Sequence, residues 1–542
     1  MRLRLDAALL REWPAEARME ASDLDGEARR TGHDAPVPAE AARAETAEAG
    51  EAGLADDGSR SVLRVTPDDD EEDIFQSAAR RGMARKGECV ARVEGRDAAD
   101  AGARAALVVE GFFHGAFRLS KAEVGALAAT QGRGEAIDLF ARRDALCDHG
   151  GGALIIDCDF DVREAVGAAL LRARCEGYAR ALGTLPNNLL RTDDMARYLT
   201  ALAARRGLDC AIHRDDELRK MGCGGILSVN RGSAQQAALV VLTPRPEENP
   251  TPRPDMAGPE GDAVPGRMPG TGVSTRTAGL GLRDGGMEAA DLSRKGGSVA
   301  PLALVGKGVM FDAGGYHLKD IDGMRDMHSD MCGAAVAAET LECLALAGRG
   351  RGVCAVLPLV ENAIGPDALK MGDVISTLSG KTVEVYNTDA EGRLILCDAL
   401  THAQSLGAAA VIDIATLTYG AQRALGDAVA ARFTNDPDGL GARFAHAARM
   451  AAQPTWPMPL DRRYHAALRW SAIADLANYA PGYGASACTA AAFLEEFIAP
   501  DHVWLHIDAV GPSVRRGACD WECPGATGFG LRALARMIAQ SD

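Results

Sequence analysis

The chain has 542 residues, of which 59 are Lys or Arg and 76 are Asp or Glu, so its formal net charge is −17. This length exceeds one ordinary domain, and 47% apolar with 25% charged residues is typical of a soluble globular protein. The acidic balance disfavours nucleic acid and anionic membranes as partners, and no apolar run is long enough to span a bilayer. The 13 cysteines are odd in number and lie among apolar residues, which favours reduced thiols and a cytoplasmic location.

The first part of the chain is predicted to form an arm followed by a small domain. Residues 1–60 are expected to be an acidic, Ala- and Glu-rich, disordered arm, because they have too few large apolar side chains to offset the entropy of ordering. An N-terminal α/β domain is expected over 61–160, with strands at Ser61–Val65, Ala105–Val109 and Ala153–Asp157. Apolar residues recurring at three and four positions predict a long helix over Val162–Leu182, within a linker at 161–185.

The rest of the chain, 186–542, is predicted to be one larger α/β domain. A Pro- and Gly-rich segment without periodicity interrupts it at 246–299 and is expected to be a surface insertion. Helices are expected near 331–347, 391–406, 485–498 and 525–539, and strands at Leu302–Val305, Gly352–Leu357, Ala408–Ile414 and His502–Ile507. Because these strands are apolar without alternation, they predict a mostly parallel sheet covered on both faces, with its active site beyond the strands' carboxyl ends.

Two segments carry residues suited to chemistry. The first, VGKGVMFDAGGYHLKD from Val305, contains Lys307, Asp312 and Lys319 among glycines that let the backbone approach a ligand closely. Asp330 follows in MHSDMCGAA, near a predicted helix start, where an acid also serves as a cap.

The second segment is NTDAEGRLILCDAL, which begins at Asn387 between a predicted strand (Val383–Tyr386) and a predicted helix. It places Asp389, Glu391 and Arg393 at alternate positions. Taken alone, an acidic first turn of a helix explains the two acids. Phosphate binding is disfavoured, because the segment lacks the GxxxxGK[ST] pattern and the nearby acids would repel phosphate.

Taken together, the two segments predict a metal centre. Asp312, Asp330, Asp389 and Glu391 supply four negative charges, which two divalent cations would balance; without cations such close carboxylates repel one another or take up protons. Oxygen ligands without Cys or His allow zinc, manganese, magnesium or cobalt. Lys307 can add a nitrogen ligand only as the neutral amine. Two ions that share a water and polarise a carbonyl predict amide hydrolysis.

These residues resemble the signature of the leucyl aminopeptidase family, the cytosolic dizinc aminopeptidases. The resemblance rests on VGKGVMFDAGG, Lys319, MHSDMCGAA and NTDAEGRL, and continues through ATLT, ACTAAAFLEEF and GATGFGLR, over about residues 160–542 apart from the insertion. It implies a metal-dependent aminopeptidase that removes N-terminal Leu and other apolar residues from peptides through a water bridging two ions, zinc first among them. It also implies a homohexamer, a dimer of trimers.

The resemblance implies a role for each matched residue. Lys319 would polarise the scissile carbonyl, and Arg393, with the Gly392 and Leu394 amides, would hold bicarbonate as the general base. The implied metal ligands are Lys307, Asp312, Asp330, Asp389 and Glu391. The implied substrate pocket comprises Met327, Asn387, Ala390, Thr416 and Leu417.

Three features depart from the family pattern: Cys332 and Tyr419 replace usual glycines, and the 246–299 insertion interrupts the domain. Cys332 is expected to crowd the site or add an oxidisable thiol, and Tyr419 to alter specificity. His317 and His328 stand at positions that the family does not use, and His506 is interpreted as a core residue.

Two other functions remain open from the sequence. One is a non-hydrolytic binding role on the same scaffold, either DNA-binding or chaperone-like. The other is a different two-metal hydrolase, such as a phosphoesterase.

Overall fold

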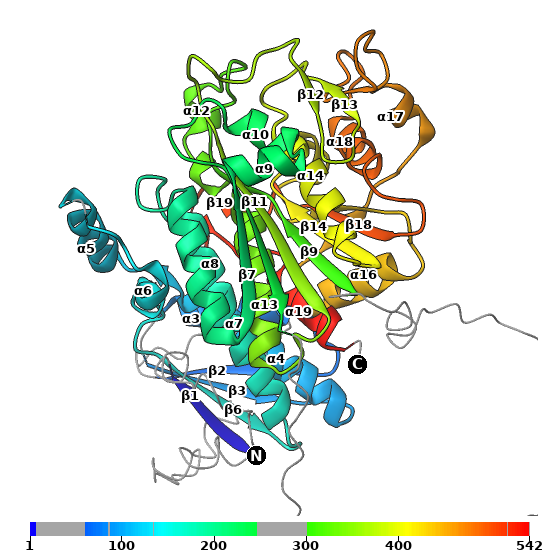
Figure 1. The fold of residues 1–542 in the computed structure, drawn as a ribbon. Helices are drawn as coiled ribbons and strands as arrows, with labels where there is room; N and C mark the ends of the chain where they lie inside the picture. Colours follow the sequence, from blue (N-terminus) through cyan, green and yellow to red (C-terminus); the bar gives the residue numbers. More distant parts are fainter. Residues whose placement is uncertain (7–59, 85–86, 134, 246–300, 518, 541–542) are drawn as a thin grey trace, which may run out of the picture.

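The computed structural model describes residues 1–6, 60–84, 87–133, 135–245, 301–517 and 519–540 (Figure 1). The predicted insertion and residues 7–59 of the predicted arm lie outside these ranges. A small α/β unit lies at the bottom of Figure 1 and a larger α/β unit above it, and helix α7 (Arg163–Thr184) runs between them, as the periodicity predicts. Within the described residues, no helix is both long and apolar enough to cross a membrane.

The small unit is built on a four-stranded sheet in the order β1-β6-β3-β2. Strands β2 (Arg60–Val65), β3 (Glu88–Val93) and β6 (Ala153–Cys158) are parallel, and β1 (Arg2–Asp6) pairs antiparallel with β6. The first residues of the chain therefore belong to this sheet rather than to an arm. Its helices are α3 (Glu71–Met83) and α4 (Ala98–Ala116). The segment that follows packs beside α7 and α8 (Thr192–Arg206) instead and contributes to the core of the larger unit; it contains β4 (Arg118–Leu119), α5 (Lys121–Gly132), α6 (Leu139–Leu146) and β5 (Cys147–Asp148).

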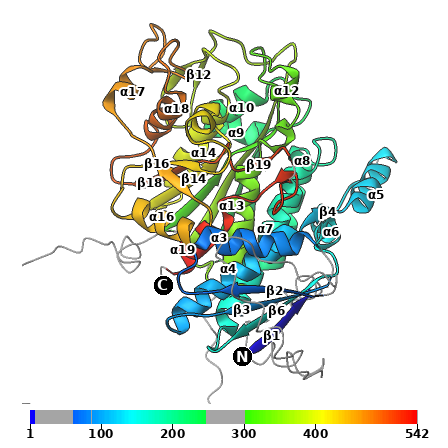
Figure 2. The ribbon, with the colours of Figure 1, turned by 180° about the vertical axis from the view of Figure 1, so that it is seen from behind.

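The strand predicted at 105–109 is wrong, because these residues lie in the middle of helix α4. This helix is buried along almost its whole length, between α3, the sheet and α7 (Figure 2). A helix buried on every side has an unbroken apolar sequence, which cannot be told from a buried strand by periodicity.

Helices α3 and α4 pack closely because glycines remove side chains at their contact. A Cβ on Gly115 would lie 1.9 Å from the carbonyl oxygen of Ala79. We expect Gly115→Ala to lower the free energy of unfolding by about 1–3 kcal/mol, since the helices would have to separate. Gly125 is the control, because a Cβ there meets nothing within 4 Å. In urea denaturation, Gly125→Ala should be neutral or stabilising by up to about 1 kcal/mol; equal destabilisation by both would contradict the prediction.

The larger unit is built on a mixed sheet with strand order β16-β15-β18-β14-β9-β11-β8-β7. The four central strands are parallel and correspond to the four predicted ones: β18 (Val503–Asp508), β14 (Ala410–Ala415), β9 (Leu302–Gly306) and β11 (Val353–Asn362). The outer strands add antiparallel pairings, so the sheet is only mostly parallel. The outer strands are β7 (Leu208–Arg214), β8 (Ala238–Pro244), β15 (Ala430–Thr434) and β16 (Thr455–Pro457).

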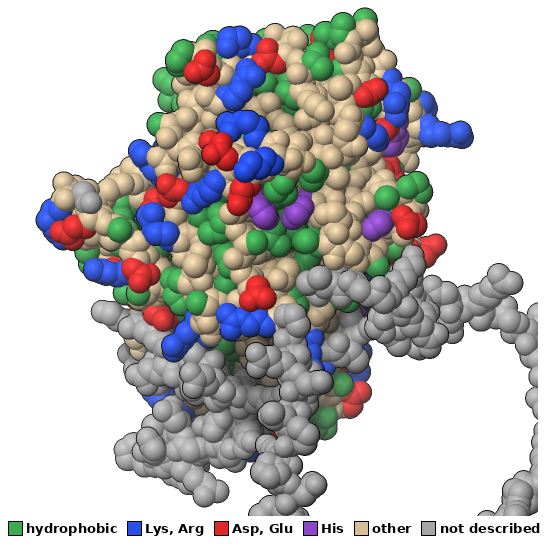
Figure 3. Space-filling view, viewed as in Figure 1, with side chains coloured by type: hydrophobic (Ala, Val, Ile, Leu, Met, Phe, Trp, Pro, Cys, Tyr) green, Lys and Arg blue, Asp and Glu red, His purple; other side chains and the backbone are tan. Residues whose placement is uncertain are grey.

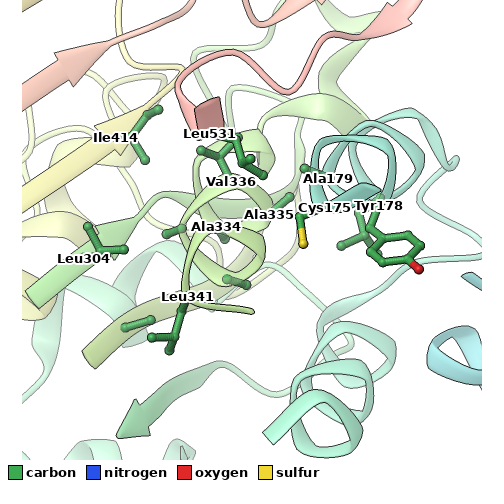
Figure 4. Packing of buried hydrophobic residues seen from close by; sticks show 14 of the residues in the cluster. Cys175, Tyr178, Ala179, Leu304, Ala334, Ala335, Val336, Leu341, Ile414 and Leu531 are labelled. Carbon is green, nitrogen blue, oxygen red and sulfur yellow. The ribbon is translucent and has the colours of Figure 1, made fainter. Parts of the chain in front are cut away.

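Helices cover both faces of this sheet and form two separate cores. Leu304 points into a core with α7, α13 (Cys332–Leu346) and α19 (Leu531–Ala539), which Figure 4 shows around α13. Its neighbours Ala303 and Val305 point into the opposite core, with α14 (Gly392–Ser405) and α18 (Ser486–Glu495). Helix α19 begins later than predicted, because Gly525–Ala526 form the short strand β20.

The remaining elements of the larger unit surround these layers. They are α8 (Thr192–Arg206), α9 (Asp215–Met221), α10 (Gly224–Asn230), β10 (Gly308–Asp312), α12 (Ile321–Met324), the 3-10 helix η2 (Met327–Ser329), β12 (Val374–Ser376), β13 (Thr382–Glu384), α15 (Tyr419–Leu425), α16 (Leu440–Met450), α17 (Arg462–Ala466), β17 (Leu476–Ala477) and β19 (Val514–Arg515).

Candidate active site

Lys307 occupies a break between two strands at the carboxyl end of the central sheet. Strands β9 and β10 both pair in parallel with β11, and Lys307 is the residue between them. Its backbone N–H donates to Ile414 O of β14 at 3.1 Å, and its carbonyl accepts from Ala334 N of α13 at 2.8 Å. The side chain is therefore fixed where three central strands and a helix meet.

Three buried carboxylates converge on this lysine. Asp312 ends β10, Asp330 follows η2, and Glu391 precedes α14. One oxygen from each lies within 4.8 Å of the others. Lys307 Nζ lies 2.9 Å from Asp330 Oδ2 and 2.9 Å from Glu391 Oε1. The fold thus brings together acids from segments that are far apart in the sequence.

Lys319 extends the cluster to the fourth acid. Its Nζ lies 2.8 Å from Asp312 Oδ2 and also pairs with Asp389. Asp389 is the most accessible of the four acids, with 21% of its side chain exposed. All seven residues predicted for ligation and catalysis except Arg393 therefore form one connected cluster.

Hydrogen bonds join the two signature loops. Asn362, at the end of β11, donates to Asp312 Oδ1 at 2.8 Å and to the carbonyl of Thr388 at 3.0 Å. The Thr388 hydroxyl in turn donates to the carbonyl of Gly314 at 2.7 Å. The sequence reasoning missed Asn362, and its only signal was a polar residue at the carboxyl end of a buried strand.

Burial and charge repulsion between the acids shift the pKa values of the cluster. Burial raises the pKa of Asp330 to about 8, and the carboxylates of Glu391 and Asp312 add to this rise. Burial raises the pKa of Asp389 to about 7, again with help from neighbouring acids. Burial alone would lower the pKa of Lys307 and Lys319, but the surrounding carboxylates raise both above their ordinary values. The two ammonium groups thus stand where cationic charge is most needed.

The donor set fits divalent metal ions. Glu391 Oε2 is buried and has no hydrogen-bond partner among the described residues, so a further cation can contact it. Gly392 leaves room for this arrangement, because a Cβ there would lie 2.7 Å from Lys307 Cε. Carboxylate oxygens with one amine suit zinc or manganese.

Arg393 lies apart from the cavity, near the start of α14. Its Nη1 donates to the carbonyl of Asn478 at 2.8 Å, and its buried Nε has no hydrogen-bond partner among the described residues. Burial lowers its pKa to about 10. The Leu394 amide already donates to Glu391 O at 2.9 Å. A buried, unpaired guanidinium is a site for an anion.

Asn478 is a second residue that the sequence reasoning missed. Its Oδ1 accepts from the backbone N–H of Tyr386 and Asn387, and its amide donates to the carbonyl of Asn387 at 2.6 Å. It therefore fixes the start of the NTDAEGRL loop from a distant part of the chain, directly after β17 (Leu476–Ala477), where the sequence carries no recognisable motif.

A cavity of about 370 Å³ opens over the cluster. Of the predicted pocket residues, Met327, Thr416 and Leu417 line it, whereas Asn387 and Ala390 do not. Asn387 instead accepts a hydrogen bond from Asp389 N at 2.8 Å and so shapes the loop. Besides Tyr419, the lining includes residues that the sequence did not single out: Asp326, Ser329, Gln422, Asp427, Val510, Val514, Arg515, Arg516, Gly517 and Cys519.

The two unusual residues have different fates. Cys332 is buried outside the cavity, where its thiol lies 2.7 Å from the place of a Cβ on Gly183 in α7, and burial raises its pKa to about 12. Cys332 therefore does not narrow the cavity, and its thiol does not face it. Tyr419 lines the cavity, with its ring centroid 5.7 Å from Lys319 Nζ.

None of the three singled-out histidines lines the cavity. His317 is exposed and His328 is half-buried. His506 is fully buried and pairs with Asp413 at 2.6 Å, which confirms that it belongs to the core.

The model of the cytosol aminopeptidase family, catalytic domain (Peptidase_M17), matches residues 177–258 and 288–535. A probable cytosol aminopeptidase of Chlorobaculum tepidum is 34% identical over 436 residues, 80% of this chain and 75% of that protein. One from Chlorobium luteolum is 33% identical over 500 residues, 90% and 84% of the two chains. The solved structure of the bottromycin maturation enzyme BotP in complex with Mn aligns with a TM-score of 0.67 at 28% identity, over 87% of this chain and 88% of that chain. The chain therefore belongs to the cytosol aminopeptidase family, whose members are metal-dependent exopeptidases.

Proposed function

We propose that this aminopeptidase uses two divalent ions to remove an apolar N-terminal residue, such as Leu, from peptides. The observation that carries the proposal is the convergence of Asp312, Asp330 and Glu391 within 4.8 Å in a buried site at the base of an open cavity. Isolated acids would not be buried together unless cations compensated them.

Lys307, Asp312, Asp330, Asp389 and Glu391 would hold the ions. Bound there, two ions would supply a nucleophilic water and polarise the scissile carbonyl. The Mn in BotP makes manganese a second candidate beside zinc. Lys307 would ligate as a neutral amine, so an ion has to displace its proton.

The cavity wall supports a preference for an apolar first residue. The Thr416 hydroxyl donates to Asp330 Oδ1 at 2.7 Å, and Lys307 Nζ donates to the carbonyl of Thr416 at 2.9 Å. The neighbouring Leu417 side chain, with Met327, lines the same cavity. An apolar wall tied directly to the ligand residues favours an apolar first side chain next to the scissile bond. Lys319, protonated and in the cavity, is placed to stabilise charge on the carbonyl oxygen.

Arg393 would hold bicarbonate beside the cluster. Its buried Nε, which has no hydrogen-bond partner among the described residues, supports an anion there. The positive end of the α14 dipole adds to this attraction. A carbonate oxygen is suited to accept a proton during the reaction.

Metal binding should release protons. Asp330 and Asp389 have pKa values of about 8 and about 7, and Lys307 carries a proton, so near neutral pH binding expels protons from these groups. Raising the pH from about 6 to about 8 should therefore strengthen Mn²⁺ binding. Titration calorimetry in buffers of different ionisation enthalpy should count about one proton or more per site. Asp389→Asn should lower that count, and heats independent of the buffer would contradict the prediction.

Elemental analysis and a substrate panel test the function together. Purified protein should contain two divalent ions per chain and cleave Leu-anilide faster than Asp- or Lys-anilide. Phosphate monoesters assayed beside the anilides should remain intact. The proposal would be refuted if the purified protein binds no metal, or if it cleaves phosphate esters but no anilide.

We also propose that the chain assembles as a hexamer, a dimer of trimers, in the cytoplasm. Exposed apolar side chains gather around one loop pair, since Tyr316 donates to the carbonyl of Gly365 at 3.2 Å and Ile364 lies beside it. The exposed apolar side chains nearby in the sequence are Leu318, Met371 and Ile321, the first residue of α12. Such patches are typical of subunit contacts.

The free cysteines of the described residues and the relatives named cytosol aminopeptidases support the proposed cytoplasmic location. To test the hexamer, sedimentation velocity should give a molecular mass six times that of one chain.

DNA binding has less support as a second role. On the face that Figure 3 shows, Lys and Arg side chains alternate with Asp and Glu and do not form a continuous basic stripe. With a net charge of −17, such a surface gives little counterion release on DNA.

A further inference from the structure

Two arginines, Arg515 and Arg516, line the cavity together with the acid cluster and carry the opposite charge. Arg515 belongs to β19, and the next residue, Arg516, continues the same wall. Pairing of β19 with β20 fixes the Arg515 backbone, with Arg515 opposite Gly525. No part of the proposed hydrolytic chemistry uses these two guanidinium groups.

Arg515 is held from behind by a buried acid. Its Nε donates to Glu522 Oε2 at 2.8 Å, and the other oxygen of Glu522 lies 2.8 Å from His114 Nε2 of the small unit. The guanidinium also lies 5.6 Å from the Trp521 ring centroid. An arginine oriented through Nε alone keeps Nη1 and Nη2 for a ligand. Among the described residues these two nitrogens have no hydrogen-bond partner.

The carboxylates on the same wall already have partners. Asp326 pairs with Arg516 Nε at 3.2 Å, and the terminal nitrogens of Arg516 have no hydrogen-bond partner among the described residues. Asp427 accepts from Gln422 Nε2 at 2.6 Å, and its charge also acts on the Arg515 guanidinium without a hydrogen bond between them. The terminal nitrogens of both arginines therefore remain as hydrogen-bond donors on the wall of a cavity of about 370 Å³.

We propose that Arg515, with Arg516 beside it, binds a carboxylate on the leaving side of the scissile bond. This inference rests on the proposed peptide hydrolysis, which places the free amine and the carbonyl at the acid cluster. The residue after the bond then extends towards the rest of the lining. A carboxylate is the ligand that a guanidinium binds best, through two parallel hydrogen bonds. It comes either from the C-terminus of a dipeptide or from an acidic second side chain.

Matched substrates test this proposal in the metal-loaded enzyme. Leu-Gly and its amide Leu-Gly-NH₂ differ only in the terminal carboxylate, and Leu-Asp-NH₂ and Leu-Asn-NH₂ differ only in the side-chain charge. We expect KM in wild type to be about tenfold or more lower for the charged member of at least one pair. The pair that responds identifies the source of the carboxylate. Hydrolysis of Leu-anilide by the wild type tests the proposed function independently. If the wild type does not cleave Leu-anilide, the proposed function is wrong, and the carboxylate site is not what has failed.

The variants assign the effect to the wall. In Arg515→Met the KM ratio of the responsive pair should approach one, whereas Arg443→Met, at an exposed position of α16 outside the cavity, should keep the wild-type ratio. Equal KM values within both pairs in wild type would overturn the proposal, even if Arg515→Met fails to fold. An unchanged ratio in Arg515→Met would overturn it as well.

Discussion

Glu391→Gln is expected to lower kcat/KM for Leu-anilide by at least about a thousandfold, equal to about 4 kcal/mol of transition-state stabilisation. The substitution keeps the shape of the side chain and removes its charge. One Glu391 oxygen lies 2.9 Å from Lys307 Nζ, and the other is buried without a hydrogen-bond partner among the described residues. Loss of this carboxylate removes both a ligand and the negative charge that balances a second ion.

The metal content of the variant distinguishes this explanation from misfolding. Glu391→Gln should bind fewer divalent ions per chain by elemental analysis while retaining the wild-type far-ultraviolet dichroism. Glu217→Gln is the matched control, because its carboxylate is exposed on α9, and it should keep both full activity and full metal content. Wild-type activity in Glu391→Gln would remove this residue from the metal centre.

Glu110→Ala is expected to lower the free energy of unfolding by about 3–5 kcal/mol, because it leaves buried arginines without a partner. Glu110 is fully buried in α4. It accepts from Arg172 Nε of α7 at 2.6 Å and from Arg536 Nη2 of α19 at 2.8 Å. The loss should appear in urea denaturation followed by dichroism, with the small unit separating first.

An exposed ion pair that also joins the small unit to the larger one is the control. Arg449 of α16 pairs with Glu71 of α3, but 58% of the arginine side chain is exposed, so Arg449→Ala should cost less than about 1 kcal/mol. Burial would raise the pKa of Glu110, but Arg536 and Arg172 lower it below its ordinary value. The Glu110 carboxylate therefore stabilises the fold at pH values above its unfolded-state pKa. The difference in the free energy of unfolding between wild type and Glu110→Ala should become smaller as the pH falls below that value. Equal costs for the two variants would contradict this assignment.

The elements that sequence reasoning placed well are those with a clear period or contiguous pattern. The linker helix has its apolar residues at helical spacing, and the central strands are short apolar runs bounded by glycine or polar residues. Strand β1 has no such advantage, because its partner β6 is distant in the sequence and pairing over that distance leaves no local mark. Helix α4 was mistaken for a strand because burial on all sides erased its polar face.

The same contrast holds within the site. The acids and lysines stand in two short segments, so their chemistry could be read together before any distance was known. Asn362, Asn478 and Arg515 reach the site only through folding, from three segments at or just after strand ends that carry no motif of their own. The identity of a supporting residue depends on which chain segments meet, and that information is spread over the whole sequence.

The grip of α19 on α4 and α7 has a consequence for biosynthesis. Of the described elements, α19 is the last to be translated, yet Arg536 and Arg532 neutralise Glu110 and Glu176 from this helix. Until it leaves the ribosome, Glu110 has, among the described residues, only Arg172 of α7 as a partner, and Glu176 lacks Arg532. The contacts that bury these acids are then incomplete, so the small unit emerges first but matures last. Nascent chains stalled before residue 531 should thus remain sensitive to protease in α4, although that helix has already been made.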